Sequence, residues 1–259
     1  NAYDPGSTWK PVTAMAGMAS GKFPPEVKLN TTACITYGGH CFPDHNGAGF
    51  GRIGYADALR FSSNTFFYQV GVGSGSLALK KAATQLGFGR KTGIEIGWEE
   101  NLGLVGDEEW AKDGRGWAEP GSTPWIAEDM ASASSGQSVV QITPLQLARA
   151  YCVFANGGWL VTPHLADQGL DWTAPSRRTK VPIKPSTLAK IREGLRKVVE
   201  EGTGYGLNGE GIPFAAGKTG TAEDSTGGPD HAWFASYAPY PNGEIVVVAF
   251  AQNTPGGGS

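Results

Sequence analysis

The strongest fold signal in this chain lies in residues 212–252, which read IPFAAGKTGTAEDSTGGPDHAWFASYAPYPNGEIVVVAFAQ. Three segments of this stretch have the composition and alternation of strands, and they span residues 212–223, 231–240 and 244–252. The turn Pro241-Asn242-Gly243 joins the second segment to the third, and an Asn-Gly pair is typical of an antiparallel hairpin. We therefore predict consecutive antiparallel strands near the end of the chain.

Helical patterns come before these strands, in residues 7–20, 57–72, 143–156 and 186–201. In the third of them, Thr143 is a suitable cap and Pro144 suits the first helical position. Ser186 is the expected cap of the last one. Because helices come first and consecutive antiparallel strands last, we predict an α+β fold, an antiparallel sheet flanked by helices.

The least regular stretch is residues 99–137, in which Trp110, Trp117 and Trp125 stand among acidic residues and glycines. We expect it to form a loop that packs on the domain surface beside a cleft.

Composition excludes several classes of protein. The 259 residues include 21 Lys and Arg against 24 Asp and Glu, so the net charge is −3. This balance excludes a nucleic-acid binder, or a binder of anionic membranes, that depends on bulk charge. Hydrophobic residues make up 40% and charged residues 17%, which is typical of a globular protein. The longest apolar run, residues 245–251, is too short to span a bilayer.

The cysteines leave two interpretations open. Cys34 and Cys41 flank a short Gly-Gly turn, so they can form the disulfide of an exported protein or remain two free thiols. His40 and His45 lie nearby, but their spacing matches no established zinc template. We expect Cys152, within a helical pattern, to be a small buried hydrophobic residue.

The first candidate for chemistry is Ser7-Thr8-Trp9-Lys10, which follows a Pro-Gly break. A spacing of three residues places Ser7 and Lys10 on one helical face, where a neutral lysine amine can take the serine hydroxyl proton. The N–H groups of a helix N-terminus can also stabilise an oxyanion. The alternative is that Ser7 only caps the helix and Lys10 is a solvated charge.

A second candidate is Ser62-Ser63-Asn64, where a hydroxyl and an amide two residues apart can both point from a turn into a cleft. The alternative is an ordinary loop between two helical segments.

The tripeptide Lys-Thr-Gly occurs twice, at residues 91–93 and 218–220. The second copy lies in a predicted strand and is followed by Thr221, so it can present Lys218 and two threonine hydroxyls to a carboxylate. We assign the site to Lys218 and expect Lys91 to lie on the surface.

These motifs and their flanking residues resemble the transpeptidase domain of class B penicillin-binding proteins, nearest to the elongation type. Motifs of the form S-x-x-K, S-x-N and K-T-G define this group. The resemblance extends to Thr143-Pro144-Leu145-Gln146 and to Asp230-His231-Ala232-Trp233-Phe234, and it covers nearly the whole chain. It implies a penicillin-binding or serine β-lactamase-like fold.

The resemblance also implies a role for each motif residue. Ser7 would be the nucleophile, Lys10 its general base and Ser62 the proton relay to the leaving D-alanine. Asn64 would hold Lys10 and the substrate. Lys218, Thr219 and Thr221, with Gly220 between them, would bind the substrate carboxylate, and the N–H groups of Ser7 and Thr221 would form the oxyanion hole. We expect burial and the nearby Lys218 to lower the pKa of Lys10.

By this resemblance the reaction cross-links peptidoglycan stem peptides, and β-lactam antibiotics acylate the same serine. It implies no cofactor, no metal and no nucleic acid. It implies a membrane glycosyltransferase of the elongation machinery as partner, and a periplasmic location with an inner-membrane anchor. Ser63 stands where some relatives have a cysteine, so a thiol metal ligand is lost there.

The resemblance further leads us to expect one transpeptidase domain over residues 1–259 that is truncated at both ends. Two strands that would precede Ser7, a helix that would follow residue 259, an anchor and a pedestal domain lie outside this chain. We also see no signal peptide, and we expect an uncovered sheet edge and apolar face.

Two other functions are compatible with these motifs. A serine β-lactamase or β-lactam sensor on the same fold would need a base for deacylation, and the sequence leaves Glu119 and Glu128 open for that role. The long gap between Asn64 and Lys218 favours the transpeptidase. A catalytically silent scaffold is disfavoured, because the motif residues are intact.

Overall fold

The computed structural model describes residues 1–96, 99–116, 118–165, 177–206, 214–223 and 227–254. Its largest sheet consists of β9 (Ala216–Ala222), β10 (His231–Ala238) and β11 (Ile245–Ala251), in the order β11-β10-β9. Both pairings are antiparallel, so the predicted hairpin and the α+β class are confirmed. Residues 212–213 of the first predicted strand lie outside the described residues.

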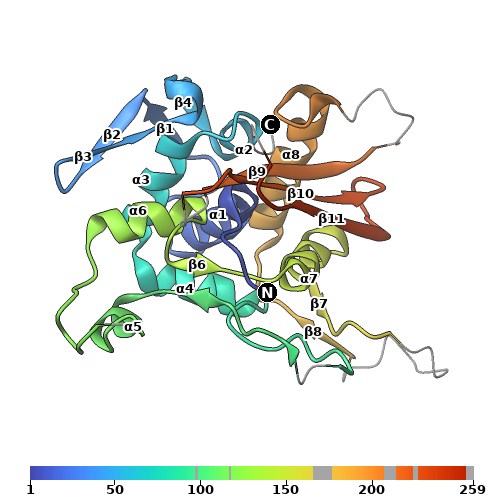
Figure 1. Ribbon diagram of the computed structural model, residues 1–259. Helices are drawn as coiled ribbons and strands as arrows, with labels where there is room; N and C mark the ends of the chain where they lie inside the picture. Colours follow the sequence, from blue (N-terminus) through green and yellow to red (C-terminus); the bar gives the residue numbers. More distant parts are fainter. Residues whose placement is uncertain (97–98, 117, 166–176, 207–213, 224–226, 255–259) are drawn as a thin grey trace.

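The helix that carries the first motif lies at the centre of the molecule (Figure 1). A 3-10 turn, η1 (Gly6–Trp9), leads directly into α1 (Lys10–Ala19). Nine of the ten residues of α1 are buried, because α1 packs against α3, α4 and α8. The prediction of a helix over residues 7–20 is therefore correct except that its first turn, which holds Ser7, is 3-10.

The predicted helix at 57–72 is wrong in one respect, because the structure divides it into α2 (Tyr55–Arg60) and α3 (Asn64–Ser74). The break falls at Ser62, whose φ of 57° is incompatible with a continuing helix. The two other predicted helices are α7 (Pro144–Ala155), capped by Thr143 as expected, and α8 (Pro185–Glu201). Ser186 is not the cap of α8, because Pro185 already occupies the first helical position.

The stretch 99–137 is more ordered than expected. It contains β5 (Leu104–Val105), α5 (Glu108–Lys112) and α6 (Ala127–Ser135), and α6 packs against α3. Trp110 and Trp125 are half-buried against the core, whereas Trp117 lies outside the described residues. The many glycines and acidic residues concealed these short helices, since few apolar positions repeat at helical spacing.

Four pairs of short strands also escaped the sequence analysis because they are only two to four residues long. They are β1 (Lys28–Thr31) with β4 (Gly51–Gly54), β2 (Cys34–Tyr37) with β3 (His40–Pro43), β5 with β6 (Val140–Gln141), and β7 (Trp159–Val161) with β8 (Arg178–Lys180). The remaining helix is α4 (Ser76–Gln85), and a short 3-10 turn, η2, spans His45–Gly47.

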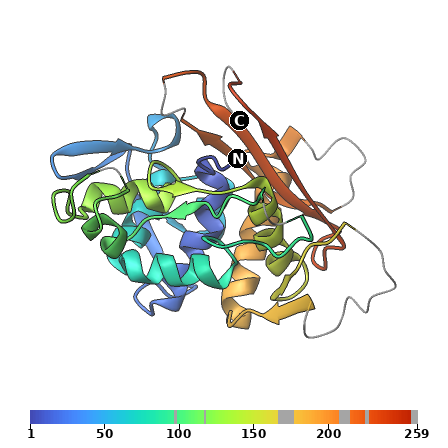
Figure 2. The same cartoon turned by 60° about the horizontal axis from the view of Figure 1, so that its bottom comes forward.

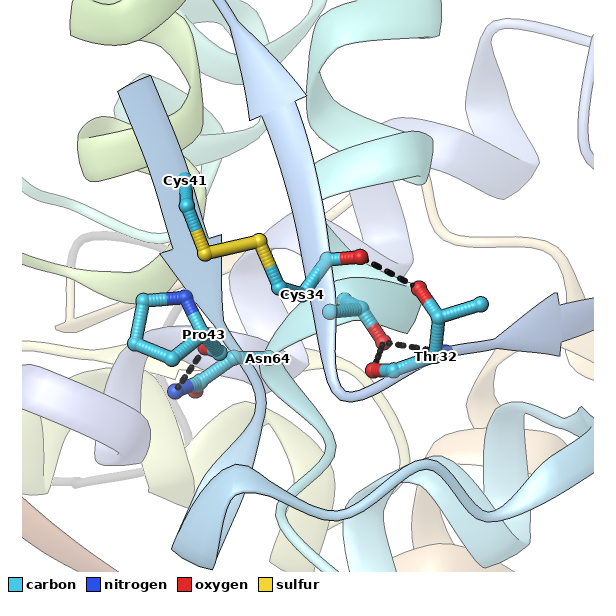
Figure 3. Close-up of a disulfide and its surroundings, with 6 residues drawn as sticks. Thr32, Cys34, Cys41, Pro43 and Asn64 are labelled. Carbon is cyan, nitrogen blue, oxygen red and sulfur yellow. Dashed lines mark hydrogen bonds between the residues drawn. A yellow bond between two sulfur atoms is a disulfide. The ribbon is translucent and has the colours of Figure 1, made fainter.

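A disulfide closes the β2–β3 hairpin, which extends from the body of the molecule (Figures 1 and 3). It joins Cys34 to Cys41, whose Cα atoms are 5.8 Å apart. The structure thus decides between the two interpretations that the sequence left open. Cys152 is a free thiol on α7, and it is partly rather than fully buried.

The sheet is covered by helices on one side (Figure 2). Helices α7 and α8 pack against it, and His231, Trp233, Ala235 and Tyr237 of β10 are buried. On β11 the alternate residues Ile245 and Val247 are 64% and 53% exposed, as expected for a sheet with an uncovered apolar face. Within the described residues, no helix has both the length and the apolar character needed to cross a membrane.

Candidate active site

The second motif forms the turn between α2 and α3. The N–H of Ser63 donates to Ala58 O at 2.9 Å and the N–H of Ser62 donates to Leu59 O at 3.1 Å. These bonds form a Schellman helix ending, in which the left-handed position is usually glycine. A serine at this position costs about 1 kcal/mol. The strained residue is the one that exposes a hydroxyl to the cavity described below.

Lys10, the first residue of α1, reaches this turn. Its Nζ atom donates to Ser62 O at 2.6 Å, to Ser62 Oγ at 3.1 Å and to Asn64 Oδ1 at 2.6 Å. The side chain is completely buried. Among the hydrogen bonds of the described residues there is none between Lys10 Nζ and Ser7 Oγ, because the amine directs its donors at the turn instead. Catalytic hydrogen bonds are often longer in a ligand-free site.

Lys218 reaches the same turn from β9. Its Nζ atom donates to Ser62 Oγ at 2.9 Å and to Thr219 O at 2.9 Å, and the side chain is completely buried. The first Lys-Thr-Gly copy has a different environment, since Lys91 is exposed and Thr92 binds the carboxylate of Glu100. The structure therefore brings Lys218 to the first two motifs and leaves Lys91 on the surface.

A cavity of about 320 Å³ opens above the turn. It is lined by six of the eight predicted site residues, namely Ser7, Ser62, Asn64, Thr219, Gly220 and Thr221. The other two, Lys10 and Lys218, do not line the cavity but lie behind Ser62. Three stretches that are far apart in the sequence thus share one groove, whose lining is rich in hydroxyl and amide groups.

Two glycines allow η1 and β9 to approach this closely. A Cβ atom on Gly6, whose φ is +51°, would lie 2.1 Å from Thr221 O. A Cβ atom on Gly220 would lie 2.8 Å from Thr8 Cγ2 and 3.0 Å from Pro5 O. Because glycine has no side chain, the backbone of Ser7 can lie directly against the strand that carries Lys218.

Burial controls the charge of the two amines. It lowers the pKa of Lys10 to about 7, and the nearby carboxylate of Asp44 partly opposes this shift. Burial also lowers the pKa of Lys218 well below its usual value, and the charge of Lys10 adds to this effect. The prediction of a lowered pKa for Lys10 is confirmed, and burial is its cause. The expected repulsion between the two amines instead lowers the pKa of Lys218.

Several site residues have no signal in the sequence. Phe42 and Tyr68 form an aromatic side of the cavity, with ring centroids 5.6 Å apart. Thr203, from the loop after α8, shares a hydrogen bond of 2.6 Å with the Thr219 hydroxyl. Asp44 lies beneath the Ser62–Asn64 turn. None of them belongs to a recognisable motif, since only the fold brings their segments to the cavity.

The remaining candidates from the sequence are two glutamates and two histidines. Neither Glu119, which is exposed, nor Glu128, which packs against Gly38 of the hairpin, lines the cavity that the structure describes. His40 is exposed, whereas His45 lines one wall of the cavity. Across the described ranges, no cluster of three or more His, Cys, Asp or Glu side chains could hold a metal ion.

Comparison of the sequence with known proteins identifies the family of this chain. The model of the penicillin-binding protein transpeptidase domain matches residues 1–259. The chain is 31% identical to the peptidoglycan D,D-transpeptidase MrdA of Haemophilus influenzae over 282 aligned residues, which cover 100% of this chain and 42% of the relative. It is 30% identical to the MrdA of Acinetobacter baumannii, with 99% and 40% covered. The chain therefore spans about two fifths of the length of these relatives.

Solved structures agree with this assignment. Pseudomonas aeruginosa PBP2 in complex with WCK 5153 has a TM-score of 0.85 and 28% identity, with 97% of this chain and 57% of the other covered. The complex between PBP2 and MreC from Helicobacter pylori has a TM-score of 0.87 and 26% identity, with 99% and 47% covered. The predicted fold and the resemblance stated from the motifs are thus confirmed. This chain belongs to the penicillin-binding protein transpeptidase domain family.

Proposed function

We propose that this chain is the catalytic domain of a peptidoglycan D,D-transpeptidase, which cross-links stem peptides through a serine acyl-enzyme. The observation that supports this most directly is the arrangement around Ser62 Oγ. Two buried lysine amines, from α1 and β9, lie within hydrogen-bond distance of this oxygen, and Ser7 lines the adjoining cavity. Family membership and the MrdA relatives support the same reaction.

In the first step Ser7 is the nucleophile. With a pKa of about 7, a large fraction of Lys10 is neutral near neutral pH, so its amine can accept the Ser7 hydroxyl proton. Ser7 Oγ then forms an ester bond to the carbonyl carbon of the penultimate D-alanine. The amide bond to the terminal D-alanine breaks, and the leaving nitrogen receives the proton from Lys10 through Ser62. The N–H groups of Ser7 and Thr221 stabilise the oxyanion.

In the second step the ester is attacked by an amine from a neighbouring stem peptide. A new amide bond forms while the amine gives up a proton through Ser62 to Lys10, the ester bond breaks, and Ser7 takes this proton from Lys10. A β-lactam resembles the D-Ala-D-Ala terminus, so it acylates Ser7 by the first step and leaves an adduct that hydrolyses slowly.

The substrate carboxylate is held at the β9 side of the cavity. The hydroxyl of Thr219 and the residues Gly220 and Thr221 line this side, and Lys218 lies directly behind them. Because Lys218 is buried, its role is electrostatic rather than that of a solvated ion-pair partner. Asn64 completes the site by fixing the Lys10 amine through its Oδ1 atom.

We further propose an extracytoplasmic location and a glycosyltransferase partner. The Cys34–Cys41 disulfide supports an oxidising compartment. One similar solved structure, with 32% identity and a TM-score of 0.85, is that of a peptidoglycan synthase complex in which polymerization and crosslinking are coordinated. The location, the membrane anchor and the partner belong to the whole protein, and residues 1–259 span about two fifths of the length of the MrdA relatives.

A fluorescent penicillin tests this function. After incubation and denaturing electrophoresis we expect a stable labelled band, which Ser7→Ala abolishes, and mass spectrometry should locate the adduct on the peptide that contains Ser7. A protein with no band would be a silent scaffold. Turnover of a coloured cephalosporin many times per minute would instead identify a β-lactamase.

A further inference from the structure

Asp44 lies at the end of the disulfide-closed hairpin, and only 3% of its surface is exposed. One carboxylate oxygen, Oδ1, accepts hydrogen bonds from the N–H groups of Asn64 and His45, at 2.5 and 2.7 Å. The other, Oδ2, accepts from Ser63 Oγ at 2.7 Å and from Thr65 Oγ1 at 2.6 Å. A buried carboxylate with four donors has a fixed position, and three of these donors belong to the Ser62–Asn64 turn or to the residue that follows it.

The carboxylate occupies the N-terminal end of α3, where Asn64 is the first helical residue. An unpaired N–H group and the positive end of the helix dipole both favour a negative charge at this point. Ser63 is also the N-cap of α3, since its Oγ atom accepts from the N–H of Phe66 at 3.3 Å. Asp44 therefore binds the cap residue and the first helical residue together.

The backbone around Asp44 is held by its own contacts. Its N–H group donates to Ala33 O at 2.8 Å, across the base of the hairpin. Pro43 O accepts from Asn64 Nδ2 at 3.4 Å (Figure 3), and the Oδ1 atom of the same amide accepts from Lys10 Nζ. The Cys34–Cys41 disulfide lies in the same hairpin, so the hairpin is a rigid support for Asp44.

We propose that Asp44 is a positioning residue, whose buried carboxylate holds the Ser62–Asn64 turn against the Lys10 amine. This inference rests on the proposed function of the site. Ser62 is in a left-handed conformation that its own residue type disfavours, so the turn needs external contacts to keep its hydroxyl in place. The hydrogen bonds to Ser63, Asn64 and Thr65 supply them.

The charge of Asp44 has a second consequence, because it raises the pKa of the Lys10 amine that burial lowers. Among the described residues with a shifted pKa, Asp44 acts electrostatically on Lys10, His45 and Tyr68, while Lys218 interacts with Lys10. Removing the negative charge should leave Lys10 neutral at a lower pH. The pH profile of acylation therefore reports on Asp44 independently of protein stability.

The test compares Asp44→Ala and Asp44→Asn with the wild type, using the second-order rate of labelling by a fluorescent penicillin between pH 5.5 and 9. The asparagine keeps an oxygen for the two backbone N–H groups, removes the charge and replaces Oδ2, the acceptor of the Ser63 and Thr65 hydroxyls, with an amide NH2 group, whereas the alanine removes all four contacts. For Asp44→Ala we expect about a 100-fold slower reaction, because small displacements of catalytic groups have effects of this size. For Asp44→Asn we expect a labelling rate within about tenfold of the wild-type rate. The acid limb of its pH–rate profile should lie about half a pH unit lower than in the wild type.

Asp107→Ala is the matched control, since Asp107 also accepts a backbone N–H, that of Trp110 at 2.9 Å, but does not line the cavity. It should label at the wild-type rate. A folded Asp44→Ala that labels within about threefold of the wild type overturns the proposal. If Asp44→Ala does not fold, an unchanged acid limb in Asp44→Asn overturns it and a shifted limb supports it. Failure of the wild type to label at all would instead refute the proposed function.

Discussion

Lys10 and Lys218 place their Nζ atoms 3.1 and 2.9 Å from the same oxygen, Ser62 Oγ. A hydroxyl oxygen has two lone pairs, and two donated hydrogen bonds use both of them. The proton of Ser62 is then free to be donated to a group in the cavity that Ser62 lines. The two amines therefore prepare this hydroxyl to deliver a proton, which is the role that a leaving nitrogen requires.

The charge state of Lys10 predicts the pH dependence of acylation. Because the amine must be neutral to accept a proton and its pKa is about 7, the labelling rate should rise with pH through about 7 and then level off. Lys10→Arg keeps a permanent charge and should reduce the rate by at least about 100-fold. Stopped-flow labelling with a fluorescent penicillin measures both effects. Lys91→Ala, a change at an exposed lysine, is the control, and an equal loss there would contradict the assignment.

The same burial predicts how stability depends on pH. The pKa of Lys10 is lower in the folded state than the ordinary 10.5, so between pH 7 and 10.5 the folded protein binds fewer protons than the unfolded chain. The free energy of unfolding should therefore rise with pH from 7 to 9, by at most about 1.4 kcal/mol per unit from this group. Urea unfolding at several pH values measures this slope. Lys10→Met should show a smaller rise, and equal slopes would indicate that Lys10 is not titrating as stated.

The close contact between η1 and β9 predicts that adding one methyl group at Gly6 lowers stability and slows acylation. Gly6→Ala would place a side chain in a left-handed conformation and against Thr221 O, so we expect a destabilisation of about 2 kcal/mol or more and slower acylation. Thermal unfolding and the labelling rate measure the two effects. Gly206→Ala is the control, since no atom of the described residues lies within 4 Å of the added atom. An unaffected Gly6→Ala would show that the close approach is not required.

The disulfide predicts a further stability difference. Cys34 and Cys41 are separated by seven positions, and the chain-entropy relation for a loop of this size gives about 2.5 kcal/mol. The double variant Cys34→Ser, Cys41→Ser should therefore unfold at a lower urea concentration, and reduction of the wild type should have a similar effect. Cys152→Ser, which removes the free thiol, is the comparison. Equal midpoints in all three proteins would show that the hairpin is held by its other contacts alone.

Much of the fold was predictable because its signals are local. The cap Thr143 and the proline after it determine where α7 begins, and Pro241-Asn242-Gly243 lies in the connection between the antiparallel strands β10 and β11. The helical pattern over residues 57–72 does not show where the helix ends, because the break at Ser62 carries no glycine or proline. Ser186 was predicted as a cap because the sequence does not show that Pro185 is already helical.

The sequence by itself determined the chemistry of the site: a serine, two lysines, an asparagine and threonine hydroxyls in motifs whose spacing marks them. Only the tertiary structure decided which groups meet. In the folded chain both lysine amines donate to Ser62 Oγ, and both lysine side chains are buried. Asp44, from a segment with no motif of its own, accepts a hydrogen bond from the Ser62–Asn64 turn. The physical reason is the sequence separation of the interacting residues. Helix caps and turns depend on neighbours within a few residues, whereas the burial and the shifted pKa of Lys10 depend on distant segments that only the folded structure brings together.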